Sequence, residues 1–66
     1  MKRSDAVKFY RAIAENSGNP SIKNLIDAGF SEGTAVNLLI RLSSMPLTAA
    51  KLKENAVKQL EKMGNA

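Results

Sequence analysis

The chain contains no cysteine, no histidine and no tryptophan, and its aromatic side chains are one tyrosine and two phenylalanines. Without cysteine or histidine, disulfide bonds, Cys/His zinc sites, thiol nucleophiles and histidine general bases are excluded. The six acidic residues are scattered, so that no pair is placed for general acid–base catalysis. We therefore expect a protein that is not an enzyme and that takes no metal, cofactor or small-molecule substrate.

Long apolar runs are also missing. No stretch approaches the roughly 18–20 apolar residues that span a bilayer, and the basic N-terminus is not followed by the apolar region of a secretory signal. The sequence thus predicts a cytoplasmic protein with no membrane partner. With 66 residues, we expect a single helical domain over 1–66 that is marginally stable alone and gains from a partner.

Positive charge is in modest excess. Ten lysines and arginines stand against six acids, which gives a net charge of +4 and a pI of about 9.8. Such a balance favours polyanionic partners, although the same charge also serves many small domains only as a solubility margin.

Apolar residues recur at spacings of three and four along the chain, and no segment alternates with period two. The pattern predicts an all-α fold, a compact domain of four helices. Helix caps are expected at Ser4, Asn19, Ser31 and Thr48, with Pro46 as the alternative start of the last helix, and Gly18, Gly29 and Gly64 close three of the helices. The expected helices span about 4–16, 20–28, 31–43 and 47–63.

The helix over 31–43 is apolar on nearly all sides and should therefore be central and buried on most of them. Val36 and Ile40 share one face of it, and this face either packs under the last helix or contacts another protein chain. The predicted core consists of Phe9, Ile13, Leu25, Ile26, Phe30, Leu38, Leu39, Leu42, Leu52, Val57 and Leu60.

The segment from Leu25 to Ala35 carries the most informative pattern. A short helix breaks at Gly29, and a second helix begins after the cap Ser31, which is the arrangement of a helix-turn-helix motif. The residues Ala28-Gly29-Phe30-Ser31, with Thr34-Ala35 after them, resemble the helix-turn-helix of DNA-binding domains, and most closely the N-terminal domain of phage terminase small subunits.

The likeness covers about a third of the chain, and only the fold element is carried over, not the packaging function. Leu25 stands where the motif commonly has a small alanine. A terminase small subunit would also need an oligomerisation region. A weaker similarity joins Gly33-Thr34 and residues 38–42 to the SAP module, whose basic residue is replaced here by Ala35.

The resemblance implies that the second helix of the motif enters the major groove of DNA. Asparagine suits adenine, arginine suits guanine or phosphate, and hydroxyls suit either bases or phosphates. Phosphate contacts are expected from Lys23 and from a flexible arm formed by Lys2 and Arg3. Each residue also has a plain structural interpretation, as a helix cap, a solvated side chain or a partner of a carboxylate. The residues predicted to reach bases or phosphates from this helix are Ser31, Thr34, Asn37 and Arg41.

Two functions follow from these patterns. The first is a small DNA-binding transcriptional regulator of a phage or mobile element, acting on double-stranded DNA as a homodimer. The second is a non-enzymatic protein-binding module, a small inhibitor or adaptor, whose contact surface is the apolar face with Val36 and Ile40.

Overall fold

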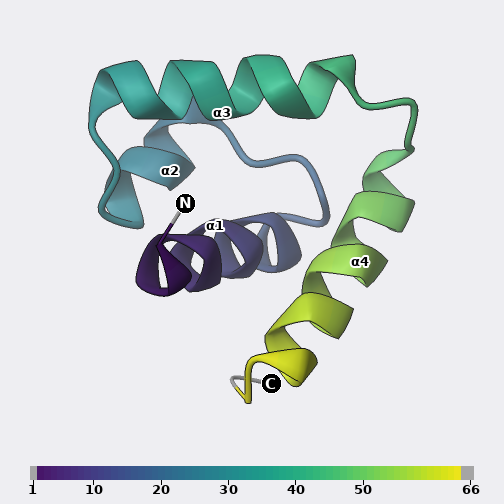
Figure 1. Cartoon of the computed structure of the whole chain (residues 1–66). Helices are drawn as coiled ribbons and strands as arrows, with labels where there is room; N and C mark the ends of the chain where they lie inside the picture. Colours follow the sequence, from purple (N-terminus) through teal and green to yellow (C-terminus); the bar gives the residue numbers. More distant parts are fainter. Residues whose placement is uncertain (1, 65–66) are drawn as a thin grey trace.

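The computed structural model describes residues 2–64 and contains four α-helices and no strand within that range. This confirms the predicted all-α, four-helix fold, and the observed bounds lie within two residues of the predicted ones. The helices are α1 (Arg3–Glu15), α2 (Ile22–Asp27), α3 (Glu32–Ser44) and α4 (Ala49–Lys62) (Figure 1).

Two of the predicted helix caps are confirmed. The Ser31 side chain accepts a hydrogen bond from the Thr34 backbone N–H, and the Thr48 hydroxyl accepts one from the Lys51 N–H at 3.2 Å. Each bond satisfies a backbone donor that has no partner within its own helix. These caps fix where α3 and α4 begin.

The two other predicted caps are wrong. α1 begins at Arg3, after Lys2, so that Ser4 lies inside its first turn. α2 is capped by Ser21 and not by Asn19, because Ser21 and Asn24 form a reciprocal capping box. The Ser21 N–H donates to Asn24 Oδ1 at 2.8 Å, and the Asn24 N–H donates to Ser21 Oγ at 3.1 Å. Two donors satisfied together outweigh the single bond that an Asn19 cap would provide.

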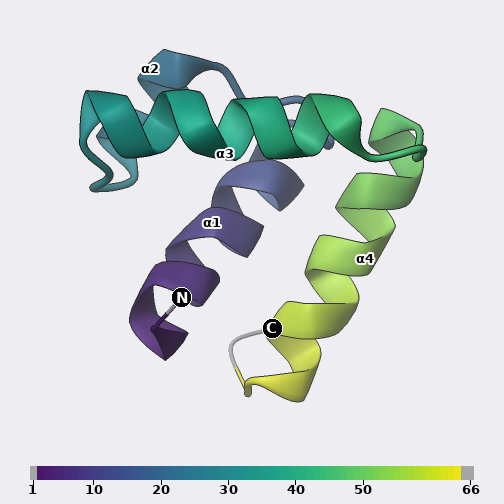
Figure 2. The same ribbon diagram turned by 45° about the horizontal axis from the view of Figure 1, so that its top comes forward.

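The helices are arranged around α1. α1 packs along α4 and also contacts α2, while α2 packs on α3. In Figure 2, α1 and α4 run side by side in opposite directions, and α3 lies across them. The Arg3 guanidinium donates a hydrogen bond to the Met63 carbonyl oxygen, which ties the start of α1 to the end of α4.

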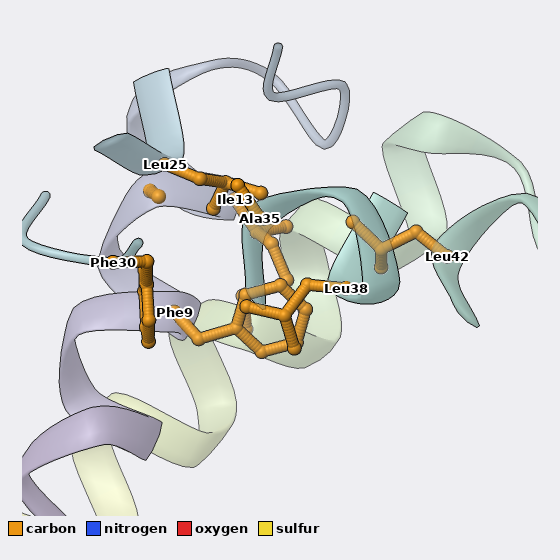
Figure 3. Close-up of a cluster of buried hydrophobic side chains, with 9 residues drawn as sticks. Phe9, Ile13, Leu25, Phe30, Ala35, Leu38 and Leu42 are labelled. Carbon is orange, nitrogen blue, oxygen red and sulfur yellow. The ribbon is translucent and has the colours of Figure 1, made fainter. Parts of the chain in front are cut away.

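The core lies between these helices and is closed by Phe9 of α1 and Phe30 below the α2–α3 turn (Figure 3). The two rings meet edge to face, with centroids 6.5 Å apart, a favourable geometry for aromatic pairs. Of the predicted core, Leu39 and Leu52 are only partly buried. The confirmed core residues are Phe9, Ile13, Leu25, Phe30, Leu38, Leu42 and Leu60.

Two core predictions are wrong, and three alanines were missed. Ile26 is 41% exposed and Val57 is 38% exposed. α2 has only six residues, and Leu25 is the one residue that it buries. Each of the three is buried by the packing of the helices, and an alanine gives a weak apolar signal in sequence. The missed core residues are Ala12, Ala35 and Ala56.

Candidate nucleic-acid interface

The turn between α2 and α3 depends on Gly29, whose φ of +114° is strained for any other residue. Its N–H donates to the Ile26 carbonyl at 3.0 Å, and the Phe30 N–H donates to the Leu25 carbonyl at 3.1 Å. The turn therefore closes tightly enough to bury Phe30. The chain then leaves the turn at Ser31, the cap of α3.

The N-terminal end of α3 is open. Each residue from 31 to 34 is exposed, and the helix buries only Ala35, Leu38 and Leu42. The expectation that α3 is buried on most sides is thus wrong. The exposure of α3 has a physical reason: α4 packs along α1 and not along α3, so that one side of α3 remains uncovered.

Four predicted DNA-contacting residues come together at one place. Ser31, Thr34, Asn37 and Arg41 line a shallow hollow of about 470 Å³, whose wall includes Phe30 and Leu38. α1 also contributes to this hollow, through Asp5. Residues three and four apart on a helix are neighbours, which explains why these side chains of α3 form one polar stripe.

The hydroxyl groups in this stripe are not equally available. Ser31 Oγ accepts from the Thr34 N–H at 3.3 Å and donates to Thr34 Oγ1 at 3.0 Å. The Ser31 hydroxyl therefore acts first as a helix cap, whereas the Thr34 hydroxyl keeps its own proton for an outside acceptor. Asn37 and Arg41 are both exposed.

Arg41 is not held by a carboxylate. Within residues 2–64, the only ion pairs join Glu54 to Lys58 at 3.1 Å and to Lys51 at 3.7 Å, all on α4. The hydrogen bond from Lys58 and the nearby positive charge of Lys51 lower the pKa of Glu54. The guanidinium of Arg41 thus remains available to a partner.

The other three predicted phosphate contacts lie elsewhere. Lys23 is exposed on α2, and neither Lys2, Arg3 nor Lys23 lines the hollow. The prediction of a flexible arm is wrong for Arg3. This residue is the first of α1 and is hydrogen-bonded to the end of α4. The hydrogen bond to the Met63 carbonyl holds Arg3 against the end of α4 and explains this difference.

Sequence reasoning missed two charged residues of α1 beside the motif. Asp5 lines the hollow, and the Lys8 ammonium lies 3.5 Å from the point where a Cβ on Gly29 would stand. Both residues are far from the turn in sequence. Only the packing of the helices places them there, and no local signal could have identified them.

Val36 and Ile40 form an apolar pair next to the polar stripe. They are 37% and 57% exposed, and Ile40 is the most exposed large apolar side chain of the described residues. Of the two alternatives for this face, packing under the last helix does not occur. The pair is open to a partner.

Comparisons of the chain with protein-family models, with curated proteins and with solved structures give no match. None of the helices in residues 2–64 is both long enough and apolar enough to cross a bilayer.

Proposed function

We propose that the protein binds double-stranded DNA through α3. The observation that carries this proposal is the open side of α3, on which Thr34 and Asn37 are exposed in the N-terminal half of the helix and Arg41 is exposed in its last turn. A recognition helix meets base edges with the side chains of its N-terminal half. The Asn37 amide at this place suits adenine, and the Arg41 guanidinium, one turn further on, suits guanine or phosphate.

The charge distribution supports phosphate contacts around α3. Lys8 stands beside the turn and Arg41 has no ion-pair partner among residues 2–64, whereas Lys23, exposed on α2, does not line the hollow. Phosphate contacts set the position of a protein on the duplex without selecting a sequence. Asp5 opposes them, because a carboxylate at the hollow repels a phosphate.

In this proposal the protein acts as a cytoplasmic homodimer that regulates transcription for a phage or mobile element. The resemblance to helix-turn-helix domains supports this role. A dimer is favoured because one helix of 13 residues makes few base contacts, whereas two half-sites about 34 Å apart multiply the affinity. No catalytic group is required.

The test is a titration of random-sequence duplex DNA at about 50 mM and about 200 mM salt, with sedimentation of the free protein to measure its oligomeric state. About four phosphate contacts would weaken binding roughly a hundredfold between these salt concentrations, because neutralised phosphates release their counterions. The absence of a salt-sensitive complex at either concentration contradicts the proposal.

Variants locate the contact surface. Asn37→Ala and Arg41→Ala should weaken binding and leave the fold intact, because both side chains are exposed. Lys53→Ala removes the same charge as Arg41→Ala from α4, which does not pack on α3. If Lys53→Ala weakens binding as much as Arg41→Ala does, the attraction comes from net charge and not from α3.

The exposure of Val36 and Ile40 favours a second candidate, a protein-binding module. Under this alternative, Val36→Asp or Ile40→Asp abolishes capture of the partner, and no DNA complex forms at any salt concentration. Because neither side chain is buried, both variants should keep the wild-type circular dichroism spectrum. A salt-sensitive DNA complex of the wild type would instead favour the first candidate.

A further inference from the structure

The outward side of α3 carries one continuous patch, formed by Gly33, Val36, Asn37 and Ile40, all of which are exposed. Each member lies three or four residues from two of the others, so that these pairs are neighbours on the helix surface. The patch combines a gap at Gly33, two aliphatic side chains and one amide. Arg41, four residues after Asn37, continues the polar side.

Folding of the chain does not explain two features of this patch, the glycine at position 33 and the exposed side chain of Ile40. Glycine inside a helix is destabilising relative to alanine, and a Cβ at Gly33 would meet no atom within 4 Å. Internal packing therefore does not require a glycine there. Ile40 is 57% exposed and contributes little to the core. A partner that approaches the helix backbone closely explains both features.

We propose that Ile40 is a specificity-determining residue, which contacts the C5 methyl group of a thymine next to an adenine that Asn37 binds. This inference rests on the proposed DNA-binding function and names the bases that α3 prefers. Thymine carries the one apolar group among the base edges of the major groove. An aliphatic side chain beside an amide therefore matches neighbouring A·T pairs.

The spacing of the two side chains fits this assignment. A helix rises about 1.5 Å per residue, so that Asn37 and Ile40 are displaced by roughly 4.5 Å along the axis. Successive base pairs are about 3.4 Å apart, so that the separation of the two residues is compatible with contacts to adjacent pairs. Gly33 lies one turn before Asn37 and lets the backbone of α3 approach the groove without a side chain between them.

The experiment begins with selection of bound duplexes from a random-sequence library. Adjacent A·T pairs should be enriched in the selected sites. Each thymine of a selected duplex is then replaced in turn by deoxyuridine, which lacks the C5 methyl group and keeps every hydrogen-bonding atom. At one thymine in each half-site, affinity should fall about fourfold, as expected for one methyl group that stays in water.

The Ile40→Ala variant identifies the residue responsible. It should bind the thymine and deoxyuridine duplexes equally well, whereas Val57→Ala, a matched exposed residue on α4, should keep the fourfold difference. Gly33→Ala should raise the melting temperature and yet weaken binding, because its methyl group separates α3 from the groove.

The outcomes separate this inference from the proposed function. Sequence-specific binding that is insensitive to deoxyuridine, or equally sensitive in Ile40→Ala, overturns the role of Ile40 and leaves DNA binding in place. Binding without any enriched sequence also overturns it. No salt-sensitive binding of any duplex overturns the inference and the proposed function together.

Discussion

Gly18 is the residue whose replacement should damage the fold most for the smallest chemical change. It lies in the loop after α1 with a φ of +81°, and the loop passes against the first turn of α4. A Cβ at Gly18 would lie 1.8 Å from the Ala49 carbonyl oxygen and 2.6 Å from the Ala49 carbonyl carbon. Both atoms belong to the backbone, which cannot rotate away as a flexible side chain can.

The cost of Gly18→Ala has two parts. The left-handed backbone costs a residue with a Cβ about 1–2 kcal/mol. Forcing the loop and α4 apart adds about 1–3 kcal/mol, the usual range for overpacking. The sum, about 2–5 kcal/mol, is a large share of the roughly 3–10 kcal/mol that stabilises a domain of this length.

Thermal and urea unfolding followed by circular dichroism measures this loss. At about 4–8 °C per kcal/mol for a small domain, the melting temperature of Gly18→Ala should fall by at least about 8 °C. Gly33→Ala is the matched control, because the same substitution falls in a helix with open space around its Cβ. Because Gly33 is the second residue of α3 and not in its interior, this variant should stabilise the protein slightly, by at most about 1 kcal/mol.

The opposite signs of these two effects make the test strict. If Gly18→Ala melts within about 2 °C of the wild type, the inference that the loop lies close against α4 is refuted. If both variants are destabilised alike, the inference that Gly18 and Gly33 have different backbone environments is refuted instead.

Three further predictions concern the core, the hollow and α4. Leu25→Ala should cost about 2–5 kcal/mol of the free energy of unfolding because Leu25 is completely buried. Ile26→Ala should cost far less because Ile26 is 41% exposed. Equal losses of stability in urea unfolding would refute the assigned burial. Asp5→Asn should tighten DNA binding about fivefold, the effect of removing a charge roughly 4 Å from a phosphate in water, and an unchanged affinity would mean that phosphates do not approach the hollow. The lowered pKa of Glu54 gives a small stabilisation that is present above the ordinary pKa of glutamate and is lost as the pH falls through the lowered value. The melting temperatures of the wild type and Glu54→Gln should therefore converge between about pH 5 and about pH 3, and a difference that widens on acidification would contradict the ion pairs.

The helix boundaries were largely predictable because they depend on neighbours in sequence. Ser31 and Thr48 cap their helices through backbone groups three residues ahead. Gly29 ends α2 through its own backbone conformation. The predicted cap at Asn19 is wrong because Ser21 and Asn24 form a stronger local pair.

The burial pattern was predictable only in part. Large aliphatic residues at helical spacing were assigned to the core, which holds for Leu25 and fails for Ile26, one residue later. The spacing alone does not say how wide the covered side of a helix is. That width depends on which helices pack on it, and α4 packs along α1 and leaves α3 partly uncovered.

The candidate site divides in the same way. The polar stripe of Thr34, Asn37 and Arg41 follows from helical spacing and could be foreseen. The presence of Asp5 and Lys8 beside it could not, since they come from α1.

The sequence by itself determined four helices, the glycine turn and two helix caps, because each of these depends on groups within a few residues of one another. Only the tertiary structure decided that α3 keeps an open side, that three alanines are buried and that α1 brings an acid and a base to the motif. These features depend on contacts between segments that are distant in the chain, and no local preference encodes them.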